Sequence, residues 1–186
     1  MPARDIYQLK VRLLEIEPPI WRRLQVRGRT TLSKLHGILQ DLAGWTNSHL
    51  YAFDVAGKRY EEPDPEAEGA NARRAQLARL GLEVGDRFEY LYDFGDDWLH
   101  EVLLEEIRPA DSDTVYPLCL DGARAWPPED CGGVPGYADS LEALQNPADP
   151  EFREMLEWLP PGYHPEIFDL RATNRILDLA HGRGSA

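Results

Sequence analysis

Apolar side chains recur at every second position of residues 7–16. They are Tyr7, Leu9, Val11 and Leu13. This period of two is typical of a strand with one buried face. Pro18 and Pro19 then interrupt the pattern, because proline cannot continue a β-ladder, and residues 21–26 resume it. The two segments are predicted to form a hairpin in which Trp21 faces the core and Arg22 faces solvent.

The apolar period changes to a helical one after Thr31. Leucines recur at positions 32, 35, 39 and 42. Thr31 is a favoured helix N-cap, and Gly44 is of the type that follows a helix end. We therefore expect one helix whose leucine stripe packs on the sheet.

Two further strand pairs follow. Residues 50–55 and 58–60 flank an Ala-Gly turn, which suits a two-residue hairpin loop. Residues 87–94 and 98–107 are rich in aromatic and aliphatic side chains and flank a Gly-Asp-Asp turn, so they predict the clearest hairpin in the chain.

The remaining segments are less regular. Residues 61–70 are predicted as an acidic loop, and residues 116–137, rich in glycine and proline, as an ordered irregular segment. Further helices are predicted at residues 72–80 and from residue 139 or 140 to residue 145. Pro150 suits the first turn of a helix at residues 151–159, and Asp169 suits the N-cap of a last helix that ends at residue 180.

These elements predict a single α+β domain, with a flexible tail at residues 179–186. The expected core is a mostly antiparallel sheet of about five to six strands with helices packed on it. The 186 residues are enough for one sizeable core, and their composition, 42% hydrophobic and 28% charged, is that of a globular domain.

Charge and cysteine content narrow the possible partners. The net charge of −13 argues against tight, specific DNA binding, which needs clustered cations. Residues 1–34 nevertheless hold eight basic and three acidic side chains, a local surplus of five. No apolar stretch suggests a membrane span or a signal peptide, and two cysteines are too few for a disulfide scaffold. The expected location is the cytoplasm.

The strongest polar constellation surrounds the Gly-Asp-Asp turn. It consists of Asp93, Asp96, Asp97 and His100, and Trp98 shares a strand face with His100. Carboxylates and an imidazole together can hold a divalent metal, so Asp96, Asp97 and His100 are candidate catalytic residues and Asp93 and His100 candidate ligands. The competing interpretation is that the turn itself requires Asp and Gly.

A second set of candidates lies in the segment 116–137. Cys119 and Cys131 are candidate metal ligands with His100, although cysteines twelve positions apart are a weak zinc pattern. Glu129, Asp130 and Tyr137, with Trp98, are candidate binding residues. We expect this segment to fold over Trp98 and to approach His100. His36 and His49 are interpreted as ordinary residues at the boundary of the core.

Four segments, taken in order, resemble one known family. They are YQLKVRLLEIEPPIWRRLQV, TLSKLHGILQDLAGWTNSHLYAF, YLYDFGDDWLHEVLLE and CLDGARAWPPEDCGGVPGY. The resemblance is to the Ri-plasmid open-reading-frame-three-like family, also called the insertion-element passenger TnpR-like family, over roughly residues 5–178. It implies an α+β domain found on plasmids, mobile elements and chromosomes, with a suggested relation to resolvases. The sequence shows no pattern of a nucleophilic serine beside arginines that would bind the scissile phosphate, so recombinase catalysis is not expected.

Three functional hypotheses follow. The first is a non-catalytic interaction or accessory domain, because no complete catalytic motif is present, whose partner would be a protein or a small molecule. The second is a metal-dependent hydrolase or nuclease built on Asp96, Asp97 and His100. The third is a DNA-associated accessory protein that uses the basic strands near Arg12, Arg22 and Arg23.

Overall fold

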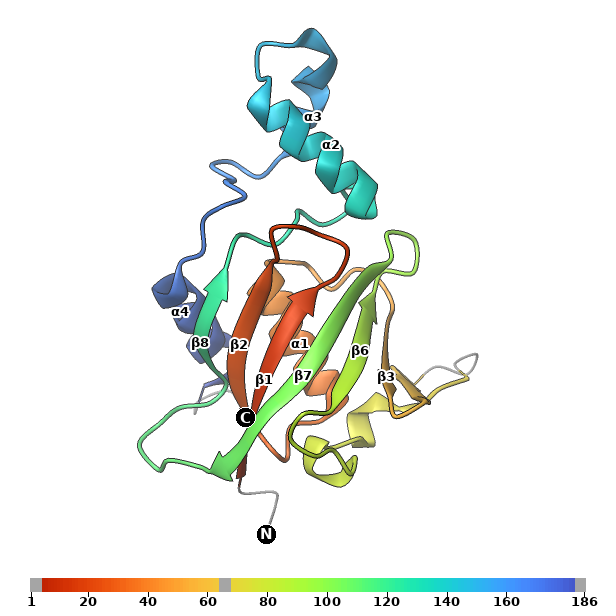
Figure 1. Cartoon of the computed structure of the whole chain (residues 1–186), viewed down its shortest axis with the longest axis vertical. Helices are drawn as coiled ribbons and strands as arrows, with labels where there is room; N and C mark the ends of the chain where they lie inside the picture. Colours follow the sequence, from red (N-terminus) through yellow and green to blue (C-terminus); the bar gives the residue numbers. More distant parts are fainter. Residues whose placement is uncertain (1–4, 64–67, 183–186) are drawn as a thin grey trace.

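A computed structural model describes residues 5–63 and 68–182 of the chain. Its centre is an eight-stranded sheet in the order β5-β4-β3-β6-β7-β1-β2-β8 (Figure 1). The strands are β1 (Asp5–Leu13), β2 (Trp21–Arg27), β3 (Tyr51–Val55), β4 (Lys58–Glu61), β5 (Ala70–Asn71), β6 (Arg87–Tyr92), β7 (Trp98–Pro109) and β8 (Leu118–Ala123). The helices are α1 (Leu32–Ala43), α2 (Gly133–Gln145), α3 (Arg153–Trp158) and α4 (Leu170–His181), with short 3₁₀ turns between some elements.

The sheet confirms the predicted α+β class and its mainly antiparallel pairing. Every neighbouring pair of strands is antiparallel except β4 and β5. Strands β6 and β7 form the predicted hairpin, in which Tyr92 pairs with Trp98 and Tyr90 with His100. The predicted number of strands is too low, because the two-residue β5 and the strand β8 lie in segments without a strand-like sequence pattern.

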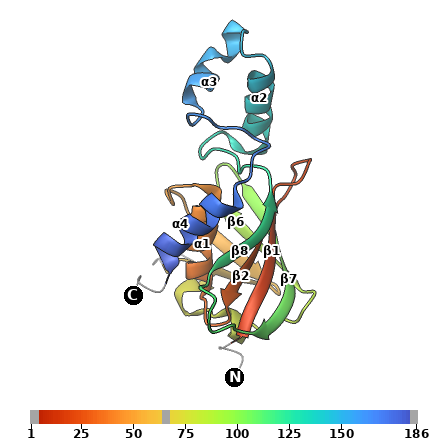
Figure 2. The same cartoon turned by 90° about the vertical axis from the view of Figure 1, so that its left-hand side faces the viewer.

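Helices α1 and α4 cover one face of the sheet (Figure 2). Thr31 caps α1 as predicted, with its hydroxyl accepting a hydrogen bond from the amide of Lys34, and Gly44 ends it at φ 74°. The leucines of α1 are buried against aromatic and aliphatic residues of the sheet. The opposite face carries charged pairs such as Arg23–Glu105, as expected for an antiparallel sheet with one solvated face.

Three local predictions need correction. Residues 72–80 form two 3₁₀ turns, Ala72–Arg74 and Leu77–Arg79, instead of one helix. Helix α2 begins at Gly133, six or seven residues before the expected start, because tight loop packing rather than a polar N-cap sets its first turn. The last helix follows the predicted Asp169 N-cap and ends at His181, one residue beyond the predicted end, so the first three residues of the predicted tail are helical; residues 183–186, and residues 64–67 of the predicted acidic loop, lie outside the described part of the chain.

The expected orientation of β2 is reversed at its start. Arg22 is only 4% exposed and Trp21 is half-buried. The Arg22 guanidinium donates to the carbonyl oxygens of Trp21, Ala123 and Arg124, and it lies over the Trp126 ring at 4.8 Å. Burial lowers the pKa of Arg22 to about 10, so the side chain still carries its charge at neutral pH.

Helix α4 runs beside the outer edge of β8 (Figure 2). The side-chain amide of Asn174 bonds both backbone groups of Cys119: its oxygen accepts from the Cys119 N–H and its nitrogen donates to the Cys119 carbonyl, each at 2.8 Å. Helices α2 and α3 pack on each other and project beyond the end of the sheet (Figures 1 and 2). In the described part of the chain, no helix has the length and apolar character to cross a bilayer.

Candidate functional site

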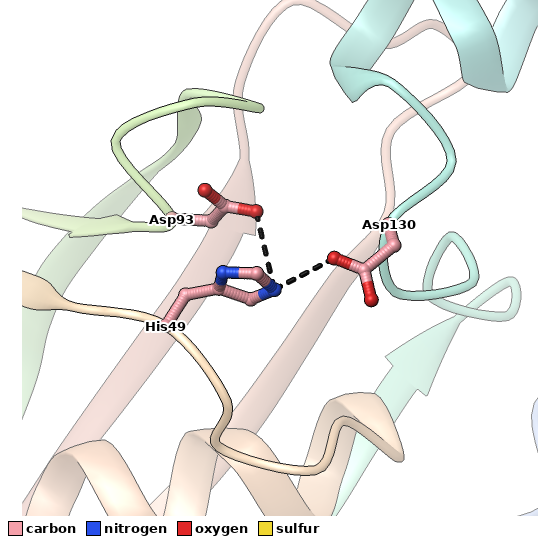
Figure 3. A group of neighbouring side chains, drawn as sticks. All are labelled: His49, Asp93 and Asp130. Atoms are coloured by element: carbon pink, nitrogen blue, oxygen red, sulfur yellow. Dashed lines mark hydrogen bonds and ion pairs between the residues drawn. The ribbon is translucent and has the colours of Figure 1, made fainter.

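Three loops meet at the end of the sheet from which α2 and α3 project. The first follows α1 and leads into β3, the second is the β6–β7 turn, and the third leads into α2. The pairing of Tyr51 with Tyr92 brings the first two loops side by side, and the amide of Asp93 donates to the carbonyl of Leu50 at 2.9 Å. His49, Asp93 and Asp130, one from each loop, point toward one another (Figure 3).

The imidazole of His49 is the centre of this group. Its Nε2 lies 2.6 Å from Oδ1 of Asp130 and 3.6 Å from Oδ2 of Asp93. The side chains of His49, Asp93 and Asp130 are 32%, 11% and 59% exposed, so the group opens to solvent on the Asp130 side. We refer to these three residues as the His49 cluster.

Nearby carboxylates control the protonation of His49. Its partial burial disfavours the charged imidazolium, but the hydrogen bond to Asp130 and the charges of Asp93, Asp130 and Glu129 outweigh burial and raise the pKa of His49. The cluster therefore attracts positive charge, supplied either by a proton on His49 or by a cation between the three side chains.

Glu129 is fixed beside the cluster by several donors. Its Oε2 accepts from the Thr46 amide at 2.7 Å and from the Thr46 hydroxyl at 2.5 Å, and its Oε1 accepts from the Tyr92 hydroxyl. Burial opposes ionisation of Glu129, but these donors and the nearby His49 lower its pKa overall. Glu129 thus contributes a fixed negative charge, with both oxygens already engaged.

The third loop is held tightly against the β6–β7 turn. The Gly132 amide donates to Oδ2 of Asp96 at 3.1 Å. Gly133 has φ +68°, and a Cβ there would stand 2.4 Å from the carbonyl oxygen of Asp96. This close approach requires glycine, and it fixes Asp130 relative to Asp93. Asp93 and Asp130 themselves adopt left-handed backbone conformations, with φ 58° and 59°.

The predicted catalytic residues lie around this turn without forming one group. Asp96 accepts from Gly132, and Asp97 is exposed. His100 is 1% exposed: its Nδ1 donates to the Tyr90 carbonyl at 3.2 Å, and its Nε2 accepts from Nε1 of Trp126 at 3.1 Å. Burial lowers the pKa of His100 to about 4, so it is a neutral core residue at neutral pH.

The other predicted ligands lie in different surroundings. Cys119 is buried on β8, and burial raises the pKa of its thiol to about 11; burial of Cys131 raises its thiol pKa to about 12. Trp98 and Tyr137 are buried core residues. Among the described residues, the His49 cluster is the group of three or more potential ligands whose donor atoms all lie within 4.8 Å of one another.

The expected approach of segment 116–137 to His100 is made by Trp126, whose ring stacks on the imidazole at 5.7 Å. The cluster itself was only partly anticipated. Asp93 and Asp130 were candidates for separate roles, whereas His49 was interpreted as a boundary residue. One sequence feature points to the cluster: His49 lies just before one predicted strand and Asp93 lies near the end of another. Only the pairing of β3 with β6 shows that these two positions are neighbours.

The donor atoms of the His49 cluster lie within reach of one small divalent cation. Ligand atoms about 2.1 Å from one ion, at angles near 90–110°, lie roughly 3.0–3.4 Å apart. The two distances from Nε2 fall on either side of this span, because 2.6 Å is a hydrogen bond to Asp130 and 3.6 Å is the longer approach of Asp93, so an ion would enter with small movements of both carboxylates. One imidazole with two carboxylates suits Mn²⁺ or Zn²⁺ better than Mg²⁺ or Ca²⁺, which favour oxygen ligands alone.

Comparison with known proteins places the chain among proteins without an assigned activity. The family model described as "Plasmid pRiA4b ORF-3-like protein" matches residues 5–172. An uncharacterized protein, y4hQ, from Sinorhizobium fredii is 42% identical over 157 residues, which cover 83% of this chain and 80% of that protein. The crystal structure of a protein of unknown function, MM3350 from Methanosarcina mazei Go1, superposes with a TM-score of 0.83 at 33% identity, covering 90% of this chain and 97% of that one.

Proposed function

The chain belongs to the plasmid pRiA4b ORF-3-like family, and from its geometry we propose that it is an interaction domain that binds one divalent cation at the His49 cluster. The observation that supports this proposal is that carboxylate oxygens of Asp130 and Asp93 both approach Nε2 of His49. A salt bridge would need only one of these carboxylates. A second carboxylate aimed at the same atom suits an ion that accepts several ligands.

The cation would connect three separate parts of the fold. Asp130 lies three residues before α2, whereas His49 and Asp93 belong to loops of the sheet. A bound ion would therefore fix the loop that leads into the projecting helices α2 and α3. We infer that it organises this end of the molecule for a partner, in line with a non-catalytic role.

Metal-dependent hydrolysis is the second candidate, and one observation favours it. The 59% exposure of Asp130 leaves one side of the proposed ion open to water. A cation with an open position can activate a water molecule. The nearby residues offer little further help, because Glu129 is engaged by Thr46 and Tyr92 and His100 is buried.

Titration of the metal-free full-length protein with Mn²⁺ or Zn²⁺ by calorimetry tests the proposal. We expect one site per chain. Because each variant removes one of three ligands, His49→Ala and Asp130→Asn should each weaken binding by at least about tenfold. The matched control is His181→Ala, since His181 also lies 2.6 Å from an aspartate, Asp41, but belongs to no three-ligand group among the described residues.

Acidification should weaken the binding of the ion, because a proton on Nε2 of His49 competes with it. The raised pKa of His49 means that this competition begins at a higher pH than for an ordinary histidine. Equal affinities for the wild-type protein and His49→Ala would refute the cation site. Cation-dependent cleavage of a phosphate ester or a peptide bond, lost in Asp130→Asn, would favour the hydrolase over the interaction domain.

A further inference from the structure

The basic surplus of residues 1–34 is distributed unevenly in the fold. Arg12 pairs with Glu17, Arg23 pairs with Glu105, and Arg22 is buried against backbone carbonyls. Lys10 lies over the ring of Trp21. The other described cations of this region are Arg27, Arg29 and Lys34, and none of them takes part in an ion pair among the described residues.

These three cations line one groove at the beginning of α1. The groove has a volume of about 570 Å³, and its walls also include Thr30, Gln76 and Tyr116. No carboxylate is among its described lining residues. His181, which also lines the groove, is already hydrogen-bonded to Asp41 at 2.6 Å.

The backbone that carries the cations is fixed. The Thr30 amide donates to the Arg27 carbonyl at 2.8 Å, and the Thr30 carbonyl accepts from the Leu77 amide at 3.0 Å. The Gly28 carbonyl accepts from the Ala78 amide at 2.9 Å. The guanidinium of Arg27 rests on the Tyr116 ring, 5.1 Å from its centre. The backbone around the cations and the side chain of Arg27 are therefore fixed before any ligand arrives, which lowers the cost of binding.

We propose that this groove binds a compact, multiply charged phosphorylated small molecule, with Arg27, Arg29 and Lys34 contacting its phosphate oxygens. Arginine and lysine form charge-assisted hydrogen bonds with phosphate, and Thr30 and Gln76 add neutral polar groups to the walls. The first turn of α1 contains no acidic residue, so the positive end of the helix dipole adds to the same potential. The volume lies within the range of about 300–1,000 Å³ that is usual for small-molecule sites.

The charge of the whole molecule favours a small anion over a nucleic acid. Three cations suffice for a compact polyphosphate, but a longer polyanion would extend from the groove onto a protein with a net charge of −13. That surface would repel the additional phosphates. The groove thus selects its ligand by length as well as by charge.

The groove is separate from the His49 cluster. The α1 residues that line the groove run from the N-cap Thr31 to Ile38, whereas His49 follows the C-terminal end of the same helix. Among the described residues, none belongs to both sites. Either proposal can fail without affecting the other.

Calorimetric titration of the full-length protein with inorganic pyrophosphate tests the groove. The buffer should have low ionic strength and be freed of divalent cations on a chelating resin, so that neither a metal ion nor a soluble carboxylate takes part. We expect saturable binding to one site. Arg29→Gln and Lys34→Gln change exposed side chains and should each weaken binding by about tenfold, the loss of one charge-assisted contact. Arg153→Gln, an exposed cation on α3, should leave the affinity unchanged.

Three results would overturn the proposal. One is the absence of saturable binding up to about 10 mM, which corresponds to an affinity too weak for a built site. Another is unchanged affinity in the double variant Arg29→Gln, Lys34→Gln. The third is tighter binding of a single-stranded oligonucleotide or of citrate than of pyrophosphate, if that binding is also lost in the double variant. This result would assign the groove to nucleic acid or to carboxylates.

Discussion

At the scale of single residues, three histidines of this chain illustrate how surroundings set charge. His36 and His100 both contact Tyr90, through its hydroxyl at 2.8 Å and its carbonyl at 3.2 Å, and burial lowers the pKa of each to about 4. His49 lies among carboxylates, and its pKa is raised. The first two are therefore neutral parts of the core, whereas the surroundings of the third favour its protonated form.

The two buried histidines should make the protein sensitive to acid. Their pKa is lower in the folded than in the unfolded chain, so the stability they contribute is complete above about pH 6.5 and is lost as the pH falls toward 4. A depression of this size corresponds to roughly 2–4 kcal/mol for each residue. Urea unfolding between pH 7 and pH 4.5 measures the loss.

His100→Gln is the informative variant for this effect. It removes one of the two titrating groups, so the free energy of unfolding should fall less steeply with decreasing pH than in the wild-type protein, whatever its value at pH 7. An equal dependence of the unfolding free energy on pH in the variant and the wild type would mean that the folded state does not lower the pKa of His100. His49 acts in the opposite direction, since its raised pKa stabilises the fold at low pH and this contribution disappears as the pH rises.

At the scale of elements, α1 links the core to both proposed sites. Leu39 on its buried face is 4% exposed. Leu39→Ala should lower the free energy of unfolding by roughly 2–5 kcal/mol, because it removes buried methyl groups and leaves a cavity against the sheet. Denaturant titration tests this, with Lys34→Ala on the exposed side as the control, expected within about 0.5 kcal/mol of the wild type. A loss below about 0.5 kcal/mol for Leu39→Ala would contradict the packing.

Elements with a strong local pattern were predictable from sequence. The helix between Thr31 and Gly44 and the β6–β7 hairpin combine periodicity with cap or turn residues, and both are confirmed. Strand β8 was missed because its residues, LCLDGA, do not alternate clearly and its pairing partner β2 lies far away in the sequence. The start of α2 was missed because Gly133 is fixed by contact with Asp96, which no local pattern reveals.

The candidate site was less predictable for the same physical reason. Turn residues identified Asp93, and the acidic segment before α2 identified Asp130, but their roles depend on a third side chain from another loop. His49 reaches them only because β3 pairs with β6 and α2 begins close to the β6–β7 turn. Such long-range placement depends on the whole sheet, whereas sequence patterns report mainly on neighbouring residues.

At the scale of the whole molecule, the distribution of charge limits binding to DNA. Arg12 and Arg23 are paired with glutamates, Arg22 is buried, and the chain carries 33 acidic side chains. We predict no nanomolar affinity for any specific duplex at about 150 mM salt, since few cations remain to displace counterions. Fluorescence anisotropy with labelled duplexes measures this. A nanomolar complex that survives this salt concentration would revive the DNA-associated hypothesis.

The contact between Asn174 and Cys119 has a consequence for how copies of this molecule behave in a crowded solution. An open strand at the end of a sheet offers its amides and carbonyls to any other extended chain, and this is a common route to β-aggregation. Here the carboxamide of one asparagine imitates a neighbouring strand, because it occupies a donor and an acceptor of β8 at once. The sheet is thereby closed at this point to addition of a further strand, without the need for a barrel or a partner subunit.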